Sequence, residues 1–231
     1  MNVYFLVEGK STEKKVYPKL VDFIFEGQLN QVKQVQEAQN NNFFLFTANG
    51  YPRIFTEVLK NAIIDINTYE NYQHLLLCID ADENSIEDRQ EELREYLQQF
   101  EEEGVVLNSN CQLHLIVQNR CIETWFLGNR KVYKSNPDNP QLIEYQSFYN
   151  VKENDPELMG CPTLFDLHAP FHLEYLKAML AERNIRYSKN FPRDVAEKHY
   201  IKELINRAEE TKAIASFHHF YQICQQIKHQ L

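Results

Sequence analysis

The chain has 231 residues, of which 43% are hydrophobic and 25% are charged, so it can bury one sizeable core and has an ordinary globular composition. Its formal net charge of -9 argues against a generic polyanion binder, because affinity for nucleic acid depends on Lys and Arg that neutralise phosphates. No apolar run approaches the roughly 18 residues needed to cross a bilayer, and the apolar stretch at residues 1–7 is too short for the core of a signal peptide. The sequence therefore predicts no membrane segment and a cytoplasmic location.

Charge is unevenly distributed along the chain. Residues 83–103 hold nine acids and two arginines, whereas residues 177–212 hold nine Lys or Arg and six acids. This pattern indicates an acidic body with one mildly basic segment near the C-terminus.

Four short apolar runs predict strands, at residues 3–7, 43–47, 75–79 and 113–118. The third run is apolar throughout, which is typical of a parallel strand covered on both faces. Helical patterns lie between the runs, and the Gln/Asn-rich residues 28–42 are interpreted as a helix end and a loop. Repeated strand–helix alternation predicts an α/β fold with a mainly parallel four-stranded sheet and helices on both faces.

From about residue 122 onward the pattern changes. Asn- and Pro-rich segments at 135–140 and 154–162 predict loops, and helices are expected at 165–180, 192–208 and 213–230. We therefore expect a catalytic core at 1–130 and a mostly helical C-terminal region at 131–231.

The first candidate site is the junction after the first predicted strand. Gly9-Lys10-Ser11 resembles the end of a P-loop, but Tyr4 stands where a P-loop needs its first glycine, so a nucleotide site is excluded there. Glu8 remains as a carboxylate at the C-terminal tip of a strand, where open α/β sheets place their ligands. The alternative is that Glu8 merely ends a strand.

The second candidate is the pair Asp80 and Asp82, at the end of the most apolar strand. Two acids one residue apart at a strand tip can converge on one divalent cation, and Mg²⁺ prefers such oxygen ligands. A D-x-D pattern alone also occurs in ordinary turns.

These features together resemble a known family. Glu8-Gly9 after the first strand and the D-x-D after a later apolar strand look like the TOPRIM domain of primases, topoisomerases and OLD-family nucleases. Segments 7–13, 49–54, 121–127 and 187–189 are more similar to small TOPRIM proteins of phage-defence systems. The resemblance covers roughly residues 1–130, and it implies that Glu8, Asp80 and Asp82 hold Mg²⁺, with Mn²⁺ as an alternative. OLD-type relatives carry an ATPase on the same chain or on a partner, so the resemblance implies an ATPase partner protein here.

Two further acids are candidate metal ligands. Glu123 follows the fourth strand and could complete a second metal position, and the alternative is an exposed residue on a helix whose Trp125 and Phe126 are buried. Glu13 could face the same metal, and the alternative is a solvated acid in the first turn of a helix, favoured by the helix dipole.

The basic C-terminal segment interleaves cations with aromatic residues, which suits single strands or flexible RNA loops. Arg186 and Arg193 are its candidate nucleic-acid-binding residues, and the alternative is a pair of surface helices with mixed charge. The resemblance places a lysine such as Lys189 near the acidic cluster, where it could stabilise the charge that develops on a scissile phosphate.

The first function hypothesis is therefore a metal-dependent nuclease that hydrolyses DNA or RNA, as the toxic effector of an antiviral defence system acting with an ATPase. The second is a non-catalytic TOPRIM-fold sensor or docking subunit, favoured by the acidic segment 83–103, which would hinder the approach of a long duplex. A homo-oligomer is compatible with either hypothesis.

Overall fold

The computed structural model describes all 231 residues, and the chain forms two compact units. Unit 1 consists of residues 1–79, 86–117 and 222–231, and unit 2 consists of residues 80–85 and 118–221. This division by contacts differs from the expected division at residue 130, because the segment that follows the last strand groups with the C-terminal helices and the end of the chain groups with the sheet.

Unit 1 is built on a single sheet of parallel strands. The strands are β1 (Asn2–Val7), β2 (Asn30–Val32), β3 (Asn42–Thr47), β4 (His74–Asp80) and β5 (Gln112–Gln118). Every residue of β1 is buried, as are all but the last of β4, which explains why these two strands have no polar face. The predicted α/β class with a parallel sheet is confirmed.

The sheet has five strands, so the prediction of four was wrong. The additional strand, β2, pairs in parallel with β3 at the edge of the sheet, with Asn30 opposite Asn42. It lies within residues 28–42, which were expected to form a helix end and a loop. Its Asn-Gln-Val sequence is short and mostly exposed, and therefore lacks the apolar run by which the other four strands were predicted.

The strand order is β2-β3-β1-β4-β5, which places β1 at the centre. The chain leaves β1 towards β3 and β2 on one side, whereas it leaves β4 towards β5 on the other side. Two adjacent parallel strands with diverging connections define a topological switch point, and open α/β sheets bind ligands outside the carboxyl ends of such strands. In this chain the switch point lies between β1 and β4.

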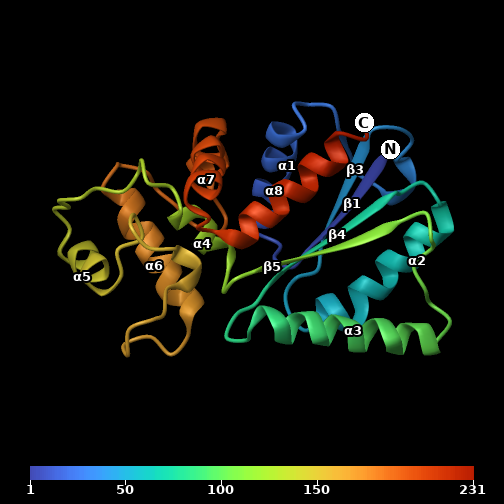
Figure 1. The fold of residues 1–231 in the computed structure, drawn as a ribbon, viewed down its shortest axis with the longest axis horizontal. Helices are drawn as coiled ribbons and strands as arrows, with labels where there is room; N and C mark the ends of the chain where they lie inside the picture. Colours follow the sequence, from blue (N-terminus) through green and yellow to red (C-terminus); the bar gives the residue numbers. More distant parts are fainter. The chain divides into compact units, whose positions relative to one another are not determined.

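Helices cover both faces of the sheet, as Figure 1 shows. Helix α1 (Glu13–Ile24) and the C-terminal end of α8 (Ala215–Lys228) lie on one face, where Lys228 Nζ is 2.8 Å from Glu26 Oε1. Helices α2 (Leu59–Tyr69) and α3 (Ile86–Glu102) lie on the other face. A short π-helix, Ile54–Val58, leads into α2, and its Phe55 ring stacks on Tyr96 of α3 at 5.4 Å.

Unit 2 is helical. Its helices are α4 (Ile122–Leu127), α5 (Pro140–Phe148), α6 (His168–Ala181), α7 (Lys198–Thr211) and the first part of α8. The three expected C-terminal helices correspond to α6, α7 and α8, although a short 3-10 helix, Arg193–Ala196, replaces the predicted start of α7. Helix α5 was not predicted; Asn139 caps it by accepting a hydrogen bond from Gln141 N at 2.9 Å, and Pro140 opens its first turn.

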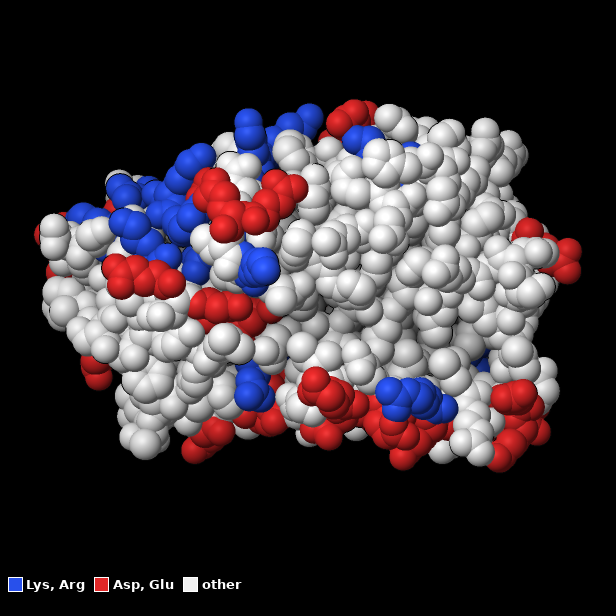
Figure 2. All heavy atoms as spheres, in the orientation of Figure 1, with Lys and Arg blue, Asp and Glu red and all other residues white.

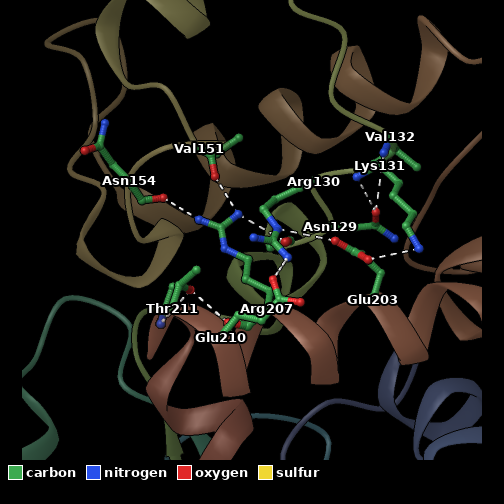
Figure 3. A network of polar contacts seen from close by, with 12 residues as sticks. Asn129, Arg130, Lys131, Val132, Val151, Asn154, Glu203, Arg207, Glu210 and Thr211 are labelled. Carbon is green, nitrogen blue, oxygen red and sulfur yellow. Dashed lines mark hydrogen bonds and ion pairs between the residues drawn. The ribbon is translucent and has the colours of Figure 1, made fainter.

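A buried arginine organises the loops of unit 2. Arg207 of α7 donates hydrogen bonds to the carbonyl oxygens of Gly128, Val151 and Asn154 at 3.1, 2.6 and 2.7 Å (Figure 3). Since Arg207 is almost fully buried, it belongs to the core of this unit and adds nothing to the basic surface of the C-terminal segment.

No helix of the structure combines the length and the apolarity that a transmembrane span requires.

Candidate metal and nucleic-acid site

Glu8 lies at the switch point of the sheet. Val7 of β1 is paired with Cys78 of β4, and the Glu8 backbone N–H donates to the Cys78 carbonyl oxygen at 3.1 Å. Asp80 is the last residue of β4. The two predicted acids therefore follow neighbouring parallel strands at the edge where such sheets bind ligands.

The turn after β1 holds a second acid close to its backbone. A Cβ atom added to Gly9 would collide with the carboxylate of Glu13, so this carboxylate lies directly against Gly9. Glu13 is only 8% exposed, which means that its interpretation as a solvated first-turn acid was wrong. A side chain at position 9 would push this carboxylate aside.

The D-x-D segment is joined to the end of β5 by backbone hydrogen bonds. Ala81 N donates to Gln118 O and Asp82 N donates to Arg120 O, both at 2.9 Å. The Arg120 guanidinium donates in return to the Asp82 carbonyl oxygen at 3.1 Å. Asp82 and Arg120 both have a left-handed backbone, with φ of 53° and 77°, a conformation that costs free energy for a residue with a long side chain.

Glu123 occupies the first turn of α4 and is completely buried. Its interpretation as an exposed helix residue was therefore wrong, although Trp125 and Phe126 are buried as that alternative expected. Its Oε1 atom accepts a hydrogen bond from the Tyr187 hydroxyl at 3.4 Å, whereas its Oε2 atom has no hydrogen-bond partner. A buried carboxylate oxygen without a hydrogen-bond partner costs roughly 1–3 kcal/mol or more when it is charged.

Lys189 is placed next to Glu123 by a tight turn. Ser188 and Phe191 form an antiparallel bridge, with Phe191 N donating to Ser188 O at 2.9 Å, so Lys189 and Asn190 form the tip of the turn. The Lys189 ammonium lies 3.7 Å from Glu123 Oε1, and half of its side chain is exposed. One face of this lysine contacts the buried acid while the rest faces solvent.

Three of the predicted site residues, Asp80, Glu123 and Lys189, act on the pKa of the Cys121 thiol. Burial raises the pKa of Cys121 well above its ordinary value, the carboxylates of Glu123 and Asp80 raise it further, and Lys189 lowers it. Asp80, Glu123 and Lys189 are therefore all near this thiol. Because the pKa is raised, Cys121 is protonated at neutral pH and is no nucleophile.

Several residues of this cluster were not predicted from the sequence. Tyr187 donates to Glu123, Arg120 fixes the D-x-D turn, and the buried imidazole of His172 lies 3.5 Å from Cys121 Sγ. Burial lowers the pKa of His172 to about 4, so this ring is neutral. Tyr187 belongs to the segment 187–189 on which the resemblance rests, but no role was predicted for it, and nothing in the sequence connects residue 172 with residue 121.

Asp80 and Glu123 are the acids of this cluster that would hold a magnesium ion. Within either unit, no group of three or more His, Cys, Asp or Glu side chains is arranged to hold a metal ion. Mg²⁺ however is commonly held by one or two carboxylates together with water and substrate phosphate oxygens. Both acids lie near the Cys121 thiol, and each would supply one carboxylate.

Arg186 and Arg193, the expected nucleic-acid ligands, are both exposed residues of unit 2. Other basic residues of this unit are engaged in ion pairs: Arg130 and Lys131 contact Glu203 (Figure 3). Lys134 contacts Glu182. Figure 2 shows Lys and Arg gathered over unit 2 with acidic side chains among them, and a row of acidic side chains along α3. The exposed arginines are therefore better candidates for phosphate contacts than the paired cations.

The fold and the acidic strand ends define the class as an α/β protein with a parallel sheet and a candidate site at its switch point. Comparison with protein-family models, with curated proteins and with solved structures finds no match to this chain.

Proposed function

We propose that this protein is a metal-dependent nuclease that hydrolyses phosphodiester bonds of DNA or RNA. The observation that carries the proposal is the buried Glu123 carboxylate, which has an unsatisfied oxygen and lies near Asp80 and Lys189 at the carboxyl end of a parallel sheet. Buried acids of like charge repel each other and are costly unless a cation compensates them.

Asp80 and Glu123 are the proposed principal ligands of Mg²⁺ or Mn²⁺, and Glu8, Asp82 and Glu13 are the further candidates. When bound, such an ion lowers the pKa of coordinated water and polarises a phosphoryl oxygen. Without it the acids would repel a polyanionic substrate, so activity should depend absolutely on metal.

Lys189 and its turn provide the proposed contact with substrate. The lysine offers one positive charge next to the acids, where it would stabilise a phosphate that gains negative charge in the transition state. Phe191 follows two residues later and is 63% exposed, which gives a stacking surface for a base. Exposed Arg186 and Arg193 would neutralise neighbouring phosphates. A flexible single strand, whose bases can stack, suits this combination of one lysine and one exposed aromatic ring.

The assignment to the TOPRIM superfamily, the role as effector of a phage-defence system and the ATPase partner belong to the same proposal. They are supported by the motifs Glu8-Gly9 and Asp80-Ala81-Asp82 and by the order in which parallel strands carry them. Tyr4 is buried within β1, which agrees with the absence of a P-loop glycine at this position.

The experiment is to incubate the pure chain with plasmid, single-stranded DNA and total RNA, each in Mg²⁺, Mn²⁺ and EDTA. The proposal expects cleavage of at least one substrate with a divalent ion and none in EDTA. Cleavage that is unchanged in EDTA would refute it. Cleavage that persists undiminished in Asp80→Asn would also refute it, because a contaminating nuclease would then account for the activity. Asp166→Asn, which alters an exposed acid of unit 2, is the matched control.

A non-catalytic sensor or docking subunit is the second candidate. It is favoured by the ion pair between Lys189 and Glu123, because a lysine can partly compensate the buried acid without a metal. The two candidates differ in one measurement, since only the nuclease requires a divalent ion to bind at Glu123.

A further inference from the structure

An apolar groove of about 630 Å³ lies in unit 1, lined by α3, by the loop that leads into β5 and by the start of β5. Five of its eight lining residues are Leu or Val: Leu97, Val105, Val106, Leu107 and Leu113. Val106 is 56% exposed, and the other four are only partly buried. The groove is therefore an apolar surface that the folded chain leaves uncovered.

The strand beside this groove has an open edge. β5 is the last strand of the sheet, so one side of its backbone has no neighbouring strand. The Gln112 N–H donates at 2.9 Å to the carbonyl oxygen of Gln73, which directly precedes β4, so the Gln112 peptide group faces β4. Since the peptide groups of a strand alternate in direction, those of Leu113 and Leu115 face the open side. No loop or helix backbone is hydrogen-bonded to either residue.

The open edge lacks the usual protection against pairing with another chain. Natural sheets protect such edges with Lys, Pro, a bulge or a covering element. The stretch Leu113-His114-Leu115 contains neither Lys nor Pro, and all three residues are only partly buried. The Leu113 side chain also lines the groove, so the open backbone and the apolar surface meet at this residue. An extended segment that pairs with β5 would place every second side chain on the side of the groove.

The charge around the groove determines which segment fits it. The exposed acids of α3 form a row along the helix (Figure 2): Glu87, Asp88, Glu91, Glu95, Glu101 and Glu102. The only exposed cation of α3, Arg94, is paired with Glu91, whereas Glu101 lines the groove. A segment that carries Lys or Arg beside its apolar residues complements this charge. A second copy of the chain would bring another acidic α3 to the same edge, where like charges repel.

We propose that the apolar groove and the open edge of β5 form a docking site for an extended segment of a partner protein, in which apolar residues alternate and Lys or Arg flank them. The backbone of this segment pairs with Leu113 and Leu115, its apolar side chains cover Val106 and the neighbouring Leu and Val residues, and its cations lie near Glu101. None of these residues belongs to the acidic strand ends, so the proposal does not depend on the nuclease function.

Selection of a random peptide library, displayed on phage, against the full chain tests the proposal. We expect the enriched peptides to share alternating apolar residues flanked by Lys or Arg. A synthetic peptide with the enriched sequence, titrated by fluorescence anisotropy, should bind Val106→Asp at least about tenfold more weakly, because this substitution places a charge in the apolar groove. Leu164→Asp, which alters an 85% exposed leucine in a loop of unit 2, is the matched control and should bind as the unmodified chain does.

Two further measurements test the charge and the strand pairing. Glu101→Lys should weaken binding of the same peptide about threefold, with a larger effect at low salt, whereas Glu209→Lys, an exposed acid of unit 2, should not. In the unmodified chain, the backbone amides of Leu113 and Leu115 should exchange hydrogen more slowly when the peptide is bound.

Four results would overturn the proposal. These are the absence of enriched peptides, enrichment of acidic peptides, equal weakening by Leu164→Asp, and binding that leaves the Leu113 and Leu115 amides unprotected. Light scattering of the chain alone tests the remaining occupant. A dimer that dissociates in Val106→Asp would assign the groove to a second copy and would also overturn the proposed partner.

Discussion

The Lys189 ammonium lies 3.7 Å from Oε1 of Glu123, a carboxylate that is completely buried while half of the lysine side chain is exposed. This relationship connects a turn in the C-terminal third of the chain with the helix that follows the last strand of the sheet. The lysine can neutralise the acid when no metal is bound. In the proposed metal-bound state it can instead contact a phosphate. The predictions below depend on this pair and on the buried groups around it.

Divalent metal should stabilise the protein. A ligand at 100 times its dissociation constant stabilises by about 3 kcal/mol, which corresponds to a rise of roughly 5–10 °C in Tm for a chain of this size. We expect Mn²⁺ or Mg²⁺ to produce such a rise, EDTA to reverse it, and Glu123→Gln to abolish it. Thermal unfolding followed by circular dichroism measures this effect. An equal rise in the Tm of Glu123→Gln would mean that the metal binds at another site.

Lys189 and the exposed arginines should affect different steps. Lys189→Ala should lower kcat more than it raises KM, because a charge at the scissile phosphate acts mainly in the transition state. Arg186→Ala and Arg193→Ala should instead weaken binding and each reduce the salt dependence of binding by about one phosphate contact. Cleavage kinetics and binding at several salt concentrations separate the two effects. If Lys189→Ala mainly weakened binding and the two arginine substitutions mainly lowered kcat, residues 186–193 would be better explained as a surface that contacts a protein partner.

Stability should depend on pH through Glu157, which is buried in unit 2. Burial raises its pKa from 4.5 to about 7, although Ser216 donates hydrogen bonds to it from its backbone N–H and its hydroxyl. A carboxyl whose pKa is higher in the folded state binds protons better when folded. Its contribution to stability is therefore complete below about pH 4.5 and is lost as the pH rises to about 7, by up to about 3 kcal/mol.

Glu157→Gln should remove this part of the pH dependence. The only tryptophan, Trp125, donates from its indole N–H to Ser216 Oγ at 2.7 Å, so its fluorescence reports on this cluster. Urea unfolding followed by Trp125 fluorescence at pH 5 and pH 8 measures the difference between the two proteins. If both lost the same stability between these pH values, Glu157 would not be the titrating group.

Arg207 should be essential for the stability of unit 2. Arg207→Met leaves three carbonyl oxygens without their donor and should lower the free energy of unfolding by about 3 kcal/mol. Lys202→Met changes an exposed cation on the same helix and should alter it by less than about 0.5 kcal/mol. Chemical denaturation measures both values, and a mild effect of Arg207→Met would mean that the loops hold without it.

Apolar runs predicted four strands to within one residue at either end, because burial on both faces leaves a continuous signal in the sequence. β2 lacked this signal, since its strand conformation comes from pairing with β3 rather than from its own side chains. Helix α5 carried the signal Asn139-Pro140, which also occurs in loops and was interpreted as one.

The candidate site was predictable in part for a similar reason. Acids at the ends of apolar strands identified Glu8 and Asp80, because parallel topology brings strand ends to one edge. The burial of Glu123 was not predictable, since all six residues of α4 are buried and no amphipathic pattern shows which side faces the protein. Tertiary contacts alone bring Tyr187 to this acid.

The most direct test of the account compares nucleic-acid cleavage by the unmodified chain, Glu123→Gln and Asp166→Asn in Mg²⁺ or Mn²⁺, with folding checked by circular dichroism. We predict that the folded Glu123→Gln protein loses at least about 100-fold in rate, because the substitution weakens binding of the metal ion that stabilises transition-state charge, whereas Asp166→Asn keeps its activity. Full cleavage by a folded Glu123→Gln protein would contradict the account.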